Sequence, residues 1–234
     1  MKGNRFMIEQ IQSTLSNPGS NSRQRLLEAA VDVFGKYGFE ASTTRMIASK
    51  AGANIAAIPY YFNGKEGLYR AVVTHIVEKI EANAGTTFQD MAALASKKNL
   101  SKKDALSALE TLLKAIINLM IGSSEAPRIA RIIMREQIDP SPAYDIIFSR
   151  LMSPFISNIA AFLTIASKNI SRREATLRAM AIMGQIMAFR VGRETAVRSM
   201  GLKGYTQDET TEIRNIIIEH TRGIFNSLSN RKAN

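Results

Sequence analysis

TTRMIASKAGANIAAIPYYFNGK, the stretch from Thr43 to Lys65, decides the fold and contains two short helical patterns. Thr43 and Thr44 place hydroxyl groups where a helix N-cap is favoured, and apolar residues follow at helical spacing. Gly52 ends this first helix, because a chain that reverses within three residues favours a residue that tolerates positive φ. Asn54 can cap a second helix, which leads into three aromatic residues. The pattern predicts a helix–turn–helix motif.

The second helix of such a motif lies in the major groove of DNA, and this stretch carries basic but no acidic residues. Asparagine pairs bidentately with adenine, and small apolar side chains pack on thymine methyl groups. Pro59 has no N–H and crowds a first turn that starts at Ile55, so we expect the helix to begin a residue late or to bend. The predicted base contacts are Asn54, Ile55, Ala56 and Ala57.

The motif belongs to a longer order of residue types. A Gly–Phe pair precedes Thr–Thr–Arg, Ile–Ala, Ala–Gly and Tyr–Tyr–Phe, and Lys65, Glu66 and Leu68 follow. From Ser22 to Arg70 this order resembles the DNA-binding domain of the TetR family of bacterial transcriptional regulators. The segments MREQIDPSPAYDII (134–147) and GQIMAFRVGRETA (184–196) are similar to the CecR-like branch of that family.

The resemblance implies contacts with DNA phosphates, for which hydroxyl, phenol and ammonium groups are suited. The implied residues are Thr43, Thr44, Tyr60, Tyr61 and Lys65. Arg45 could reach either a base or the backbone. Pro59 departs from the family's common pattern, in which an aromatic residue precedes the Tyr–Tyr pair, so one phosphate contact is absent. The alternative for the two tyrosines is that they are half-buried spacers.

The composition restricts the class of protein. The 234 residues include no Cys and two isolated His, which excludes disulfides and thiolate sites and leaves no constellation for a metal, a cofactor or an enzyme. His75 falls on an apolar stripe, and we expect a partly buried imidazole there rather than a ligand. The net charge of +11 favours a polyanionic partner, either nucleic acid or an acidic membrane. No segment is typical of a secretory or membrane-spanning sequence, so a cytoplasmic protein without a membrane partner is expected, associated with the nucleoid when bound to DNA.

Helical periodicity continues along the chain without period-two alternation, which predicts an all-α fold. The expected organisation is a flexible N-terminal arm (1–21), a three-helix DNA-binding domain (22–70) and a helical ligand-binding and dimerisation domain (71–234). Ser101 is expected to cap a long helix, and the prolines between Asp139 and Pro142 to break the chain. The last two helices are expected at about 171–200 and 208–228.

The penultimate predicted helix carries small residues at every fourth position, so one of its faces allows close approach of another helix. We interpret this ridge, with the last helix, as a four-helix subunit interface of a homodimer, which the family resemblance also implies. Ordinary packing within one chain is the alternative. The predicted interface residues are Gly184, Ala188, Gly192, Ala196, Ile213, Ile217 and Ile224.

The C-terminal part is rich in Met and Phe, and Met-rich surfaces suit varied apolar ligands. Core packing explains each Met equally well. The predicted pocket residues are Asn118, Met134, Gln137, Phe148, Met152, Met183 and Met187. The sequence therefore predicts a homodimeric repressor that a small-molecule effector releases from a palindromic operator in double-stranded DNA. The alternatives are a ligand-independent architectural DNA-binding protein of the same fold and a basic membrane-surface protein.

Overall fold

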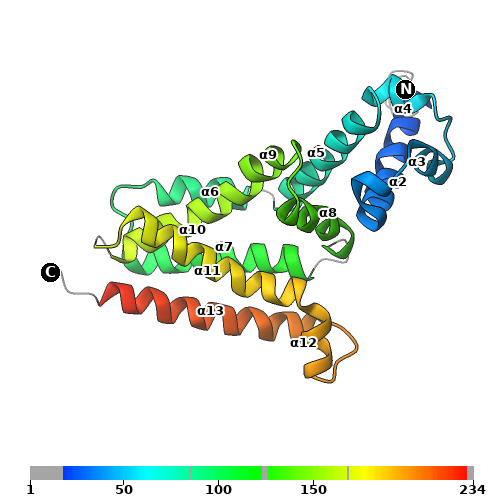
Figure 1. Ribbon diagram of the computed structural model, residues 1–234. Coiled ribbons are helices and arrows are strands. Elements are labelled where there is room, and N and C mark those ends of the chain that lie inside the picture. The colour runs from blue at the N-terminus through cyan, green and yellow to red at the C-terminus, as the bar shows by residue number, and fades with distance from the viewer. Residues whose placement is uncertain (1–17, 85, 123–125, 168, 231–234) are drawn as a thin grey trace, which may run out of the picture. The chain divides into compact units, whose positions relative to one another are not determined.

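The computed structural model describes residues 18–84, 86–122, 126–167 and 169–230, and every regular element in this part of the chain is a helix (Figure 1). The all-α prediction is therefore confirmed. The chain divides into two compact units, Met1–Ile76 with Pro127–Tyr144, and Val77–Ala126 with Asp145–Asn234. The arm predicted for residues 1–21 lies outside the described residues, except that 18–21 belong to the first helix.

The first unit is a small bundle around an aromatic core. Leu26, Ile47 and Leu68 are fully buried. The rings of Phe34 and Tyr69 meet edge to face with their centroids 5.0 Å apart, a favourable aromatic arrangement. Its helices are α2 (Pro18–Ala41), α3 (Thr44–Ala51), α4 (Ala57–Phe62), the first part of α5 (Lys65–Ala84) and α8 (Ala126–Ile138).

Local hydrogen bonds and glycines set the helix boundaries of this unit. The Thr43 hydroxyl accepts the N–H of Met46 at 3.2 Å and caps α3, as predicted. Gly52 ends α3 at φ 57°, in the left-handed region where a Cβ is strained. Asn63 and Gly64, at φ 57° and 102°, turn the chain from α4 into α5. Gly38, at φ 81°, interrupts α2.

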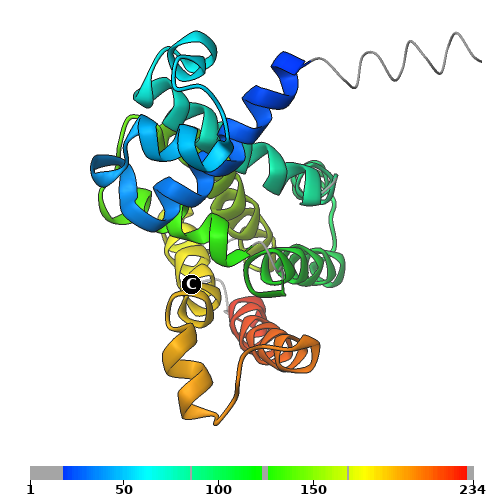
Figure 2. The ribbon, with the colours of Figure 1, turned by 90° about the vertical axis from the view of Figure 1, so that its right-hand side faces the viewer.

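The second unit is built on four long helices, of which α7 and α13 are seen nearly end-on in Figure 2. The Ser101 hydroxyl accepts the N–H of Asp104 and caps α7, as predicted. Leu109, Leu112 and Ile116 of α7 are fully buried in the core. Besides the last part of α5, the helices of this unit are α6 (Thr87–Ala95), α7 (Lys102–Ile117), η1 (Asn118–Gly122), α9 (Tyr144–Ile147), η2 (Phe148–Met152), α10 (Ser153–Ala166), α11 (Arg172–Val191), α12 (Arg193–Ser199) and α13 (Gln207–Ser229).

Two helical segments, Lys102–Gly122 and Tyr144–Ala166, have the length and composition that a membrane span requires. The same test is passed by core helices of soluble proteins. Leu113 of the first segment and Ile159 of the second are fully buried within the second unit. Their apolar character is therefore accounted for by this core.

The penultimate helix differs from the prediction. A single helix was expected over 171–200, but α11 ends at Val191 and α12 begins at Arg193. Gly192 forms the break at φ −82° and ψ 20°, and a Cβ there would lie 2.7 Å from the Ala188 carbonyl oxygen. The ridge of small residues therefore stops at the bend, and Gly192 and Ala196 do not continue the α11 face.

Candidate nucleic-acid interface

The second helix of the motif does not begin directly after Asn54, the residue predicted to cap it, but at Ala57. The N–H of Ala57 donates to the Asn54 carbonyl at 3.0 Å, and that of Ile58 donates to the Ile55 carbonyl at 3.1 Å. This tight turn precedes α4, so Pro59 is the third helical residue. The first N–H groups of a helix have no intrahelical acceptor, and proline therefore costs no hydrogen bond there. Of the two expected outcomes, a late start or a bend, the structure shows a late start, with α4 beginning two residues after Ile55.

One face of α4 is buried and the other is open. Ile58 and Phe62 are 0% and 6% exposed and pack into the first unit. On the opposite face Ile55 is 46% and Tyr60 79% exposed, and Ala56 is also exposed. Tyr60 is thus not a spacer in the described structure. Ala57 and Tyr61 are half-buried, so their predicted contacts would use the edge of this face.

The side chain of Asn54, a predicted base contact, also makes a hydrogen bond within its own turn. Its side-chain oxygen accepts the N–H of Ala56 at 2.9 Å, which caps the first turn before α4. The residue is exposed. A bidentate pair with adenine requires the oxygen to accept a second hydrogen bond, which its second lone pair permits.

The predicted phosphate-binding residues lie on several elements of the first unit. Thr43 and Arg45 are exposed at the start of α3, and Thr44 is half-buried. The Lys65 ammonium donates to the Glu40 carbonyl at 3.3 Å and lies 4.4 Å from the centroid of the Phe39 ring. It thus binds the end of α2, and an ammonium keeps further donors for a phosphate.

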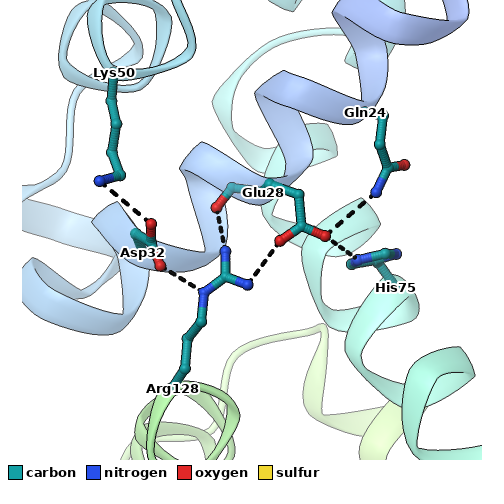
Figure 3. Close-up of polar contacts among 6 residues, drawn as sticks. All are labelled: Gln24, Glu28, Asp32, Lys50, His75 and Arg128. Atoms are coloured by element: carbon teal, nitrogen blue, oxygen red, sulfur yellow. Dashed lines mark hydrogen bonds and ion pairs between the residues drawn. The ribbon is translucent and has the colours of Figure 1, made fainter. Parts of the chain in front are cut away.

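A polar cluster missed by the sequence reasoning fixes α8 to α2 (Figure 3). The Arg128 guanidinium donates through Nε to Asp32 at 2.5 Å and through NH1 to the Glu28 carboxylate at 2.7 Å. Its NH2 donates to the Glu28 carbonyl at 2.7 Å. A planar fork that serves three acceptors at once fixes orientation as well as distance. About 100 residues of sequence separate the partners, so no local spacing signals the contact.

The same two carboxylates also bind the neighbouring helices. Lys50 of α3 lies 3.3 Å from Asp32, and His75 of α5 lies 3.0 Å from Glu28, whose carboxylate also accepts from Gln24 (Figure 3). His75 is half-buried and partnered, as predicted. Partial burial opposes ionisation of Asp32, but the hydrogen bonds and charges of Arg128 and Lys50 outweigh it and hold its pKa below the ordinary value.

A second cluster secures the end of α8. Glu136 is 2% exposed, and its carboxylate accepts from the Tyr69 hydroxyl at 2.6 Å and from the N–H and hydroxyl of Ser141 at 3.1 and 2.9 Å. Burial, followed by the hydrogen bond to Glu136, raises the pKa of Tyr69, so the phenol stays protonated and remains a donor. The proline-rich turn after α8 therefore closes onto a satisfied buried carboxylate.

The predicted pocket residues are divided between the units. Met134 and Gln137 belong to the first unit, and the other five to the second. Asn118 and Phe148 are exposed, Met152 and Met187 half-buried and Met183 buried. A surface groove of about 570 Å³ lies between α6 and α7, but it is lined by other residues, Met91, Leu94, Lys97, Asn99, Leu100, Asp104, Ser107, Ala108 and Thr111.

The residues predicted for the subunit surface differ in exposure on α13. Ile213 and Ile217 are 4% and 1% exposed within the chain's own core, so a second chain has no access to them, and Ile224 is half-buried. Ile216, between them, is exposed. The structure therefore leaves Ile216, rather than Ile213 and Ile217, exposed on the surface of α13, and the subunit interface stays a prediction.

An exposed apolar stripe runs along α11, spaced by three and four residues as on one helical face. Gly184 and Ala188 of the prediction belong to it. The large residues of the stripe, Leu177, Met180 and Val191, are 56%, 52% and 58% exposed. Their spacing is visible in the sequence, on the same helical face as the small residues Gly184 and Ala188.

Comparison with known proteins agrees with these features. Residues 26–72 match the model of the bacterial regulatory proteins of the tetR family, and residues 105–228 match the C-terminal domain of the HTH-type transcriptional dual regulator CecR. The chain belongs to the TetR family of helix–turn–helix transcriptional regulators. Within that family it belongs to the CecR-like branch: it is 32% identical to CecR of Shigella flexneri over 91% of this chain and 95% of that protein. It is a DNA-binding transcriptional regulator, and its relatives are not enzymes.

Solved structures share the fold. A crystal structure of AibR with isovaleryl coenzyme A and operator DNA has a TM-score of 0.61 at 14% identity, covering 85% of this chain and 97% of that one. FadR of Bacillus subtilis with stearoyl-CoA has a TM-score of 0.56 at 15% identity, covering 84% and 95%. Among the residues that the structure describes, no group of three His, Asp or Glu is placed to hold a metal ion.

Proposed function

We propose that the protein is a homodimeric repressor that binds a palindromic operator and is released by a small-molecule effector. The observation that carries the proposal is the open face of α4, where Tyr60 is 79% and Ile55 46% exposed beside the capped start of α3. In a dimer, two such helices enter successive major grooves on one side of the duplex.

The base-reading role falls to Asn54, Ile55 and Ala56, which lead into α4, with Ala57 at its edge. Thr43, Thr44, Arg45, Tyr60, Tyr61 and Lys65 supply phosphate contacts that fix the helix in the groove. The absence of acidic residues from Thr43 to Lys65 supports this assignment, since a carboxylate there would repel the backbone.

Dimerisation through α11 and α13 is supported by the exposed apolar stripe. Gly184 and Ala188 leave a shallow surface between Met180 and Val191, and a Cβ at Gly184 would meet no atom within 4 Å. Large exposed apolar side chains on neighbouring turns mark a surface that a partner covers. A C2 dimer would pair this stripe with its own copy.

The effector is proposed to bind in the helical C-terminal part. AibR and FadR, which share the fold, have been solved with coenzyme A thioesters, so this class is the first to test. A ligand releases DNA only if it binds the DNA-incompetent conformation more tightly than the competent one. With such partners the protein would act in the bacterial cytoplasm.

The proposed function is tested by footprinting the purified protein on genomic fragments. We expect protection of a palindrome with half-site centres about 34–36 Å apart or a multiple of that distance, and reversal by an effector that raises the melting temperature. Protection without symmetry would contradict the dimeric mode. If no compound of a broad ligand panel raises the melting temperature while the protein still binds DNA, the ligand-independent architectural protein is favoured.

Tyr60→Ala tests the α4 face directly. The residue is 79% exposed, so stability should be unchanged, whereas operator affinity should fall about tenfold through one lost hydrogen bond per half-site. Tyr37→Ala is the matched control, because Tyr37 is also exposed in the first unit but lies outside the motif. Equal affinities of the two variants, measured by fluorescence anisotropy, would remove α4 from the DNA interface.

A further inference from the structure

The polar contacts of the second unit bring several helix ends together. The Lys102 ammonium donates to the Ser229 carbonyl at 3.1 Å, which places the start of α7 beside the end of α13. Gln185 of α11 lies 3.0 Å from His220 of α13, and the Tyr205 hydroxyl just before α13 donates to the Phe189 carbonyl near the end of α11, so the two helices run antiparallel. Counting back along α11 and forward along α13 therefore brings the start of α11 to the same end. Figure 1 shows the two starts and the end of α13 on one side of this unit.

This end of the unit is strongly basic. Two adjacent carboxylates are occupied: Asp104 accepts from Ser101 at 2.6 Å, and Glu174 accepts from Arg178 at 2.8 Å. The basic side chains here are all exposed, and we call them the basic end: Lys97, Lys98, Lys102, Lys103, Arg172 and Arg173.

Among the residues that the structure describes, the net charge of the second unit arises at the basic end. The described residues of this unit include 16 Lys and Arg against 12 Asp and Glu. Without the basic end and its two neighbouring carboxylates, the remaining charges are 10 basic and 10 acidic. A solvated surface with mixed charges would not concentrate its whole excess on three helix ends, so the distribution indicates a polyanionic partner.

The chemistry of the basic end favours one kind of polyanion. Among the described residues of this unit, the one exposed aromatic side chain is that of Phe148 in η2, away from the residues of the basic end in the sequence, so no aromatic platform for the bases of a single strand is found there. Of the large exposed apolar side chains on α11, Leu177 lies one turn from Arg173, whereas Met180 and Val191 lie further along the helix, so the basic end has too little apolar surface beside it to anchor on a lipid surface. Lysines act on phosphate as hydrated point charges without reading bases.

We propose that the basic end is a second DNA-binding surface, which holds the phosphate backbone of duplex DNA independently of sequence. It goes beyond the proposed operator binding, because its residues are distinct from those of the helix–turn–helix motif. A regulator bound through α4 could then hold a second duplex, or a distant segment of the same one. Binding at the basic end depends on counterion release and weakens steeply with salt.

The test uses the full chain with its motif weakened by Arg45→Ala and Tyr60→Ala. On this background, K97Q/K98Q removes two charges of the basic end, and K114Q/K203Q removes two exposed lysines elsewhere in the same unit. Affinity for a duplex of arbitrary sequence is measured by anisotropy over a series of salt concentrations. We expect K97Q/K98Q to reduce the slope of log affinity against log salt by about 2, and the control pair to leave it unchanged.

The second variant, R172Q/R173Q, should reduce the slope similarly, and thermal denaturation checks that each variant is folded. Equal changes in both lysine pairs would show an effect of net charge alone and overturn the proposal. Complete loss of DNA binding in the motif-weakened background would also overturn it. So would a K97Q/K98Q variant that binds DNA as before but loses binding to vesicles of anionic phospholipid, which would assign the surface to a membrane.

Discussion

At the scale of single residues, the position of α4 depends on a glycine that is not part of its own helix. Gly67 lies in the first turn of α5, and a Cβ there would be 1.7 Å from the Phe62 carbonyl oxygen. No side chain fits at that distance without moving the backbone. The end of α4 therefore approaches α5 as closely as it does because residue 67 has no side chain.

Gly67→Ala should destabilise the first unit by about 3 kcal/mol, near the upper end of what overpacking costs, because the clash is with backbone. Gly35→Ala is the control in the same unit: its Cβ would meet neighbours at 3.6 Å or more, and alanine in a helix interior gains about 1 kcal/mol over glycine. Urea denaturation of both variants measures the difference. A Gly67→Ala protein as stable as the parent would contradict the close packing of α4 on α5.

The caps were predictable from the sequence at this scale, whereas Gly67 was not. Thr43 and Ser101 satisfy N–H groups three residues away, so the pattern of residue types contains the whole interaction. Gly52 is required by the φ of its own backbone. Gly67 is required by a carbonyl that the Asn63–Gly64 turn brings near, and spacing alone gives no sign of that approach.

At the scale of elements, α8 is a structural part of the first unit. The sequence pattern assigned residues 127–144 to the C-terminal domain, and the compact units place them with α2 and α5. Arg128 contacts two carboxylates of α2, and Glu136 accepts from Tyr69 of α5. These contacts join residues 67 to 100 positions apart, which is why helical periodicity predicted α8 itself but not its neighbours.

Arg128→Met should destabilise the protein by about 1–3 kcal/mol, because Glu28 and Asp32 lose charge-assisted hydrogen bonds while remaining close to each other. Arg128→Lys should recover only part of this, since an ammonium lacks the fork. Arg198→Met removes an ion pair whose side chains are 80% and 69% exposed, and should cost at most about 0.5 kcal/mol. Chemical denaturation compares the three, and equal losses at Arg128 and Arg198 would be inconsistent with a structural role of the cluster.

At the scale of the whole molecule, the assembly depends on which residues remain exposed after the core is formed. The sequence pattern predicted the fold class and, to within a residue or two, the two ends of α13. It could not decide between Ile216 and Ile217, because both lie in an apolar run and only packing against the other helices buries one of them. The bend at Gly192 was missed for a related reason, since glycine is compatible with both a continuous and a broken helix.

Met180→Glu should convert dimers into monomers, because it buries a charge in the middle of the proposed interface at a cost that side-chain contacts cannot offset. Met200→Glu is the control: Met200 is 47% exposed, close to the 52% of Met180, but follows α12 and lies off the stripe. Light scattering measures the mass of each variant. Dimers that survive Met180→Glu and dissociate with Met200→Glu would place the interface elsewhere.

The short, half-buried α4 also bears on how such a regulator could acquire new target sites. If α4 recognises DNA as proposed, Ile58 and Phe62 can be substituted only together with the core residues that they contact, and Pro59 fixes the local backbone. Divergence of the recognised sequence would then be concentrated at Ile55, Ala56 and Tyr60. A lineage of duplicated copies should therefore vary at these three positions first, while the residues between them drift slowly.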